Sequence, residues 1–97
     1  MNKLYIDTTS NKEIIVRLTV DEKVFEEKRE IENNRTQIVL PLVEKLLHEN
    51  NLKPQDLEKI EVNPGPGSFT GVRVGVSISN ALIFGLKIDA SLVKPLY

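Results

Sequence analysis

The sequence predicts an α/β domain in the element order βββαβαβ, with a mixed five-stranded sheet and two helices. Three observations support this: the first third alternates apolar and polar residues, two later segments have helical periodicity, and a short apolar run follows each of them. The chain has 97 residues, of which 40% are hydrophobic, and this is enough for one hydrophobic core. We therefore expect residues 1–97 to form a single domain.

The first three strands are expected to form an antiparallel meander over residues 3–31. Residues 4–8 are a short apolar run with β-branched side chains, and turn-forming residues follow it. Residues 14–20 then alternate with period two, as expected for a strand with one buried face. Residues 24–31 continue the pattern with more charges, which indicates a strand near the edge of the sheet with a solvated polar face.

The first helix is expected to run from an N-cap at Thr36 to about Asn51. Pro41 lies near its first turn, where a missing backbone donor costs least. The apolar residues of this helix cover more than one face, so we expect two of its sides to be buried. His48, in the last turn, is interpreted as a cation placed favourably at the negative end of the helix dipole.

A strand at residues 60–63, a second helix and a last strand around residues 88–93 complete the expected domain. The second helix is expected to begin at Ser68 or Thr70 and to end near Phe84. Because helical crossovers connect these later strands, the strands can lie parallel in the sheet.

Composition excludes several classes of function. The formal net charge of −1 does not provide the basic stripe that nucleic-acid binding needs, so any contact with tRNA would have to be shared with another protein. The chain has no cysteine and one histidine, so disulfides and cysteine- or histidine-rich metal sites are not expected. The N-terminus shows no targeting segment, and residues 74–86 are too short and too polar to span a membrane. We expect a cytoplasmic protein.

The stretch NPGPGSFTGVRVG, residues 63–75, places a glycine-rich turn between a strand and the start of a helix. Backbone N–H groups at such a position can hold an anion, and the candidate residues for a nucleotide are then Asp7, Gly67, Ser68 and Arg73. The glycine spacing differs from a dinucleotide fingerprint, and the lysine of a P-loop is absent. Simpler interpretations are an N-cap at Ser68, accepting from the amide of Thr70 or Gly71, and turn hydrogen bonds at Asp7.

Gly71, Gly75 and Ser79 recur every four residues and therefore lie on one face of the second helix. We expect this face to form a flat groove that contacts either another part of the domain or a partner chain. Val74, Ile78 and Leu82 are then expected to pack against the sheet. Arg73 has two interpretations. It binds a phosphate or an acidic partner, or it forms a salt bridge or stays solvated.

The segment GPGSFTGVRVGVSISNALIFGL resembles the signature of the TsaB (YeaZ) family, and LYIDTTSN is similar to the first strand of that family. The resemblance extends from about Leu4 to Val93 and implies an actin/Hsp70-like (ASKHA) fold. Family members are about twice this length, so the resemblance also implies that the usual C-terminal domain is absent.

The resemblance implies a non-catalytic scaffold subunit without a cofactor. TsaB proteins partner the TsaD transferase, which with TsaE and ATP attaches threonylcarbamoyl to N6 of adenosine 37 in tRNA. A homodimer is expected in isolation, with tRNA bound only through the complex. In the family, both helices contact their counterparts in the partner. Carried over to this chain, the candidate interface residues are Ile38, Pro41, Leu42, Lys45, Gly71, Gly75, Ser79 and Ile83.

Two alternatives remain open at this point. One is a nucleotide-binding half-domain or enzyme that holds phosphate with the Gly65–Gly71 loop, assisted by Asp7 and Arg73. The other is an inactive, truncated homologue that associates with itself. If the glycine groove is the interface, Gly75→Leu should abolish dimerisation and leave the monomer folded.

Overall fold

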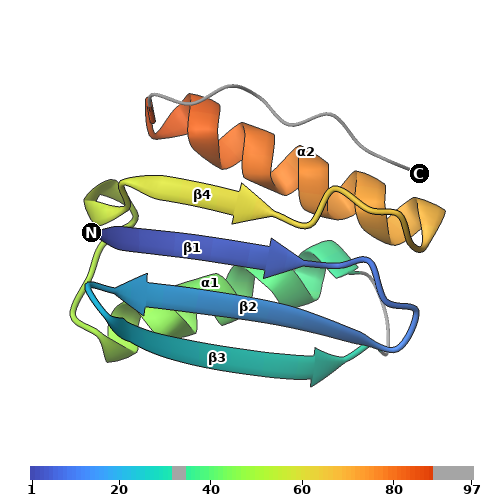
Figure 1. The fold of residues 1–97 in the computed structure, drawn as a ribbon, viewed down its shortest axis with the longest axis horizontal. Helices are drawn as coiled ribbons and strands as arrows, with labels where there is room; N and C mark the ends of the chain where they lie inside the picture. Colours follow the sequence, from blue (N-terminus) through green and yellow to red (C-terminus); the bar gives the residue numbers. More distant parts are fainter. Residues whose placement is uncertain (32–34, 89–97) are drawn as a thin grey trace.

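The described chain consists of a mixed sheet with both helices packed on one of its faces (Figure 1). The computed structural model describes residues 1–31 and 35–88. Its strand order is β3-β2-β1-β4, with β1 antiparallel to β2 and parallel to β4. The strands are β1 (Asn2–Asp7), β2 (Glu13–Val20), β3 (Lys23–Glu30) and β4 (Lys59–Val62). The helices are α1 (Arg35–Glu49), a short 3₁₀ helix at Pro54–Asp56, and α2 (Phe69–Gly85).

This architecture confirms the predicted α/β class and the antiparallel meander, and β3 is an edge strand as its charges indicated. The predicted last strand, around residues 88–93, lies almost entirely outside the described residues, so the sheet has four described strands. Neither helix of the described residues has the length and apolar composition of a membrane span.

The alternating residues of the first two strands form one face of the core. Leu4 is paired with Leu18 and Ile6 with Val16, and all four side chains are fully buried. Ile60 and Val62 of β4 extend this face, because they are in register with β1. The period of two therefore places these six side chains on the face that the helices cover, whereas Ile15, between Ile14 and Val16, points to the opposite face.

Helix α1 buries one broad face against β2 and β3. Its buried residues are Val39, Leu42, Val43, Leu46 and Leu47. Leu42 was a candidate interface residue on the sequence, but it is 2% exposed and belongs to the core. Lys45 is exposed, and its Nζ lies 2.8 Å from Glu27 Oε1 of β3, so this candidate holds the helix to the edge strand. Within the described chain, the second side of α1 is not covered.

Helix α2 packs on the sheet through its small residues, which reverses the orientation expected from the sequence. Gly71, Gly75, Ser79 and Ile83 are all buried, so of the two contacts left open for the glycine face, with another part of the domain or with a partner chain, the structure shows the contact within the domain. A Cβ atom at position 75 would overlap Thr8 Oγ1 and lie 3.3 Å from Val62 Cγ2.

The physical reason for this orientation is Thr8, directly after β1. It is fully buried, and its hydroxyl donates a hydrogen bond to the carbonyl of Gly71. The backbone of α2 must approach Thr8 closely for this bond to form, and only small residues on that face of the helix allow it. Val74, Ile78 and Leu82, which were expected to pack on the sheet, are only partly buried.

Replacing Gly75 with leucine is expected to unfold or strongly destabilise the chain itself. The added side chain collides with Thr8 and Val62, and overpacking of this kind costs roughly 1–3 kcal/mol or more. Chemical denaturation of both proteins measures the loss. Ala81→Leu on the exposed side of α2 is the matched control and should leave stability nearly unchanged. A Gly75→Leu monomer as stable as the parent would contradict this packing.

Replacing Ser79 with alanine is expected to stabilise the chain by about 1 kcal/mol, because a buried polar group without a partner is costly. Ser79 Oγ is fully buried and has no hydrogen-bond partner among the described residues. Ser77→Ala is the control: Ser77 is exposed on the same helix, so the control gains only the helix propensity of alanine, about 0.5 kcal/mol. Equal gains for both variants in thermal denaturation would show that Ser79 is not desolvated.

Candidate protein interface

The glycine-rich turn between β4 and α2 packs against the turn that follows β1. Asn63 Oδ1 accepts a hydrogen bond from the Gly65 amide at 3.1 Å, and Gly65 has a φ of 106°, which favours glycine. The Ser68 amide donates to the Thr9 carbonyl at 2.8 Å. A Cβ atom at Gly67 would lie 2.7 Å from Thr9 Cβ, so Gly67 allows two backbones to come close. The turn is therefore filled by contacts within the chain.

Asp7 lies at the end of β1 and uses its carboxylate within this turn region. Its oxygens accept hydrogen bonds from the Thr9 amide at 3.0 Å, the Thr9 hydroxyl at 2.7 Å and Asn63 Nδ2 at 3.2 Å. Partial burial by itself would raise the pKa of Asp7, but these hydrogen bonds outweigh it and hold the pKa below its ordinary value of 3.8. The simpler interpretation of Asp7, turn hydrogen bonding, is confirmed.

Ser68 is the N-cap of α2, as the sequence predicted. Its hydroxyl oxygen accepts a hydrogen bond from the Gly71 amide at 3.3 Å. Within residues 1–31 and 35–88, no three His, Cys, Asp or Glu side chains come together as metal ligands would. Asp7, Gly67 and Ser68 are thus neighbours at one edge of the sheet, whereas Arg73 lies on the outer side of α2.

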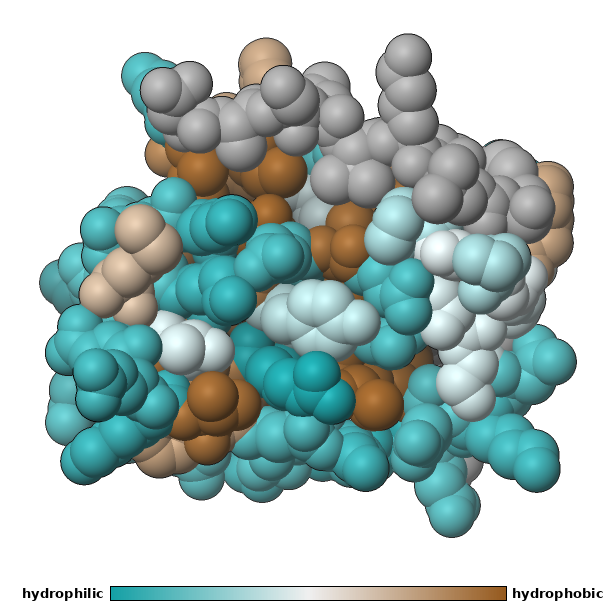
Figure 2. All heavy atoms as spheres, viewed as in Figure 1, coloured by the Kyte–Doolittle hydropathy of each residue, from teal (hydrophilic) through white to brown (hydrophobic). Residues whose placement is uncertain are grey.

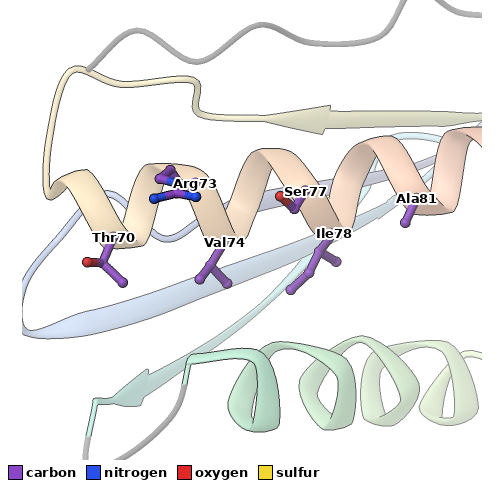
Figure 3. A pocket seen from close by; sticks show the side chains of 6 residues that line it. All are labelled: Thr70, Arg73, Val74, Ser77, Ile78 and Ala81. Carbon is purple, nitrogen blue, oxygen red and sulfur yellow. The ribbon is translucent and has the colours of Figure 1, made fainter.

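A shallow groove of about 470 Å³ runs along the outer side of α2 (Figure 3). We call it the α2 groove, and its lining residues are Thr70, Arg73, Val74, Ser77, Ile78 and Ala81. Thr70, Val74 and Ile78 recur every four residues and point toward α1 in Figure 3. Arg73 is the one charged side chain in the 17 residues of this helix.

Large apolar side chains are exposed on both helices. Phe69 and Phe84, at the two ends of α2, are 58% and 81% exposed. Leu40 of α1 is 41% exposed, and Pro41 beside it is also exposed. The exposed side of α2, with Arg73 as its one charged residue, is typical of a protein contact rather than of a solvated face.

The opposite face of the sheet has a different character, because its charges are paired with one another. Figure 2 shows this face as mostly hydrophilic, with separate apolar residues. Lys3 Nζ lies 2.9 Å from Glu61 Oε1, and Arg17 Nε lies 2.6 Å from Glu26 Oε2. The Arg17 guanidinium also stacks 5.3 Å from the centre of the Tyr5 ring. Since a largely antiparallel sheet can face water on one side, these paired charges suit a solvated face.

The candidate interface therefore differs from the set predicted on the sequence. Of that set, Pro41 and Lys45 are exposed and Ile38 is partly buried, whereas Leu42 and the four candidates on α2 are in the core. Sequence reasoning missed Leu40, Ala81 and Phe84 as exposed residues. The sequence does contain a second series with four-residue spacing on α2, Thr70, Val74 and Ile78, which lies about 100° around the helix from the glycine face because each member directly precedes a small residue.

The chain is similar to known proteins in both its sequence and its fold. The family model of TsaD, tRNA N6-adenosine threonylcarbamoyltransferase, matches residues 22–97. The tRNA threonylcarbamoyladenosine biosynthesis protein TsaB of Bacillus subtilis (strain 168) is 38% identical over 96 residues, covering 99% of this chain and 42% of the relative. TsaB of Escherichia coli (strain K12) is 38% identical over 53 residues, 55% of this chain and 23% of the relative. The solved structure of YeaZ from Pseudomonas aeruginosa superposes with a TM-score of 0.85 at 28% identity, covering 96% of this chain and 43% of that chain.

The chain has a mixed sheet with two helices on one face, and a glycine-rich turn joins β4 to α2. This arrangement defines an α/β domain of the actin/Hsp70-like class. Together with these matches, it shows that the chain belongs to the TsaB (YeaZ) family. The chain spans about two fifths of the length of the relatives that it matches over its whole length, 42% of the Bacillus protein and 43% of the Pseudomonas structure.

Asp7→Asn is expected to lower stability at neutral pH by about 1 kcal/mol, because an amide replaces the carboxylate in these hydrogen bonds and the partly exposed site lets water compensate. The folded pKa of Asp7 is depressed, so its contribution is present above the ordinary value of 3.8 and is lost as pH falls through the folded value. Urea unfolding at pH 7 and near pH 2 should show the difference from the parent shrinking at low pH. Glu22→Gln, in the exposed β2–β3 turn, is the control, and a pH-independent difference for Asp7→Asn would contradict the assignment.

Proposed function

We propose that this chain is a non-catalytic scaffold subunit in the biosynthesis of threonylcarbamoyladenosine in tRNA. In this proposal it binds a TsaD-type transferase, which modifies N6 of adenosine 37 together with a TsaE-type ATPase, in the cytoplasm. The observation that carries the proposal is the outer side of α2, where an apolar groove lies between two exposed phenylalanines. The chain binds the transferase through this surface.

The energetics of this surface support a protein partner. Val74 and Ile78 are partly exposed in the α2 groove, and Phe84 is almost entirely exposed. Burying apolar surface of this kind contributes about 25 cal/mol per Å², and aromatic side chains supply much of it at interfaces. A partner that covers the groove therefore gains binding energy and removes few charged side chains from water.

The family match supports a transferase as that partner. The TsaD family model matches residues 22–97, so the transferase and this chain have the same type of domain. Two related domains can contact each other through equivalent helices about a pseudo-two-fold axis, as the two halves of a symmetric dimer do. With a formal net charge of −1, the chain is expected to reach tRNA only through the transferase.

The polar groups of the glycine turn support a role without catalysis. The Ser68 hydroxyl is used as the N-cap, and the Asp7 carboxylate accepts three hydrogen bonds from Thr9 and Asn63. Both groups are therefore engaged in holding the turn and the start of α2. Titration with ATP and magnesium tests the nucleotide-binding alternative: no heat of binding is expected, and a signal abolished by Asp7→Ala would favour that alternative instead.

Ala81→Arg is expected to weaken binding to the TsaD-type transferase of the same organism at least tenfold. Ala81 is exposed in the α2 groove, so a large charged side chain there blocks the contact without disturbing the core. Surface-immobilised transferase and the purified chain give the affinity directly. Val24→Arg is the matched control, because Val24 is 61% exposed on the edge strand β3, away from the groove.

If Ala81→Arg and Val24→Arg bind equally well, the α2 groove is not the docking surface. Reconstituted threonylcarbamoylation with transferase, ATPase and tRNA separates the scaffold from an inactive homologue. The proposal expects activity to depend on the chain and to fall with Ala81→Arg. No dependence on the chain would favour the inactive homologue.

A further inference from the structure

Strand β3 is a free edge of the sheet within the described residues. It pairs with β2 along its whole length, from Lys23 opposite Val20 to Glu30 opposite Glu13, and Figure 1 shows it as the outermost strand. The pairing has no bulge, and the strand contains no proline. Proteins usually protect such an edge with bulges, prolines or charges, and this strand uses charges.

The backbone groups of every second residue of β3 point away from β2. Asp21 and Glu22 form a two-residue turn, with a φ of 56° at Asp21, so Val20 and Lys23 are a hydrogen-bonded pair at its base. Bonded and non-bonded pairs alternate along an antiparallel ladder. The residues with outward N–H and C=O groups are therefore Val24, Glu26, Lys28 and Glu30.

The order of the charges along β3 is complementary to its own reverse. Two acidic residues, Glu26 and Glu27, are followed by two basic residues, Lys28 and Arg29. When a second copy runs antiparallel, the acidic residues of each strand come opposite the basic residues of the other. Charges usually keep foreign strands away from an edge, and here they also match a second copy of β3.

We propose that β3 pairs with β3 of a second copy, antiparallel, about a two-fold axis at Glu27. This register places Glu26 of each copy opposite Lys28 of the other, so an unlike pair forms twice. The outward backbone groups of these two residues face each other and can continue the ladder of hydrogen bonds. Phe25 comes opposite Arg29 on the helix side, which suits a cation–π contact.

The neighbouring registers place like charges together. Residues that stand opposite each other must belong to the same face of the sheet, so the axis passes through a residue and not between two. An axis at Glu26 places Lys23 opposite Arg29, and an axis at Lys28 places Glu26 opposite Glu30. The charges of the strand therefore select the register centred on position 27.

The like pair at the axis is compensated within each chain. Glu27 meets its own equivalent there, and its Oε1 lies 2.8 Å from Lys45 Nζ of the same chain. Two lysines thus stand beside the two carboxylates and offset their repulsion.

This pairing uses a different part of the molecule from the α2 groove. Helix α2 packs on β4 and β1, whereas β3 is at the opposite edge of the sheet. One continuous sheet would then extend through both copies, and each copy would keep its α2 groove free. The pairing therefore does not depend on the proposed function.

Glu27→Cys tests the position of the axis directly. Residue 27 directs its backbone groups to β2, so it forms a non-bonded pair with its equivalent, with the two Cα atoms about 4.5 Å apart. That distance permits a disulfide, and the parent chain has no cysteine. After mild oxidation, most of this variant is expected to run as a covalent dimer on a non-reducing gel.

Glu30→Cys is the matched control on the same strand. Its thiol would stand opposite Val24 of the other copy, so the two thiols are roughly 20 Å apart and are expected to stay reduced. Ser77→Cys is the control for association through the α2 groove, where Ser77 is exposed, and it is also expected to stay reduced.

Lys28→Pro tests the backbone pairing without a disulfide. Proline removes an N–H that points outward, which an edge strand tolerates. The two-fold axis doubles the loss to two hydrogen bonds between the chains, so the dimer dissociation constant is expected to rise about tenfold in sedimentation equilibrium. Lys28→Ala keeps this N–H and is expected to weaken the dimer less, and circular dichroism melts check that both variants fold.

Several results would overturn this pairing. They are a parent chain that is monomeric at every accessible concentration, equal oxidation of Glu27→Cys and Glu30→Cys, or a folded Lys28→Pro variant that associates as strongly as the parent. A dimer that Ala81→Arg abolishes and Lys28→Pro leaves intact would likewise place the contact at the α2 groove. The transferase affinity of Ala81→Arg is measured separately, so failure at β3 leaves the proposed function standing.

Discussion

The contact between Thr8 and the small residues of α2 determines how the rest of the molecule is arranged. Thr8 is buried at the end of β1, and its hydroxyl bonds to the Gly71 carbonyl, while Gly75 leaves the space that Thr8 fills. This contact fixes the rotation of α2 about its own axis. Since the small residues face inward, Val74, Ile78 and Ala81 form the outer side, which is where a partner can reach them.

The glycine-rich signature has an architectural role in this chain. Asn63 and Gly65 form the turn, Gly67 lets it contact Thr9, and Ser68 starts the helix. The loop therefore positions the start of α2 so that the Gly71 carbonyl can accept the hydrogen bond from Thr8. A strand, a glycine turn and a helix N-terminus are also the parts of an anion site, but here the same backbone approach brings two parts of one domain together.

The features that were predicted correctly from the sequence are those that local residue patterns determine. The period of two revealed the meander, the charges of β3 its edge position, and Ser68 the start of α2. The sequence did not predict the rotation of α2 about its axis, because apolar residues occur all around this helix. Either the series Gly71, Gly75 and Ser79 or the series Thr70, Val74 and Ile78 could pack on the sheet. The residue that decides between them, Thr8, lies 63 positions before Gly71. Leu42 was misplaced for a related reason: the apolar surface of α1 is wide, and only the position of β2 and β3 shows which part is covered.

Thiol labelling at two neighbouring positions of α2 tests the rotation of the helix most directly. The chain contains no cysteine, so Ser77→Cys and Ser79→Cys each introduce one reactive group at a serine of similar size. The thiol at position 77 is expected to react with a small alkylating reagent nearly as fast as in urea, and the thiol at position 79 is expected to be protected at least ~100-fold. Rapid reaction at position 79 with protection at position 77 would contradict this orientation of α2, because the glycine face would then point outward.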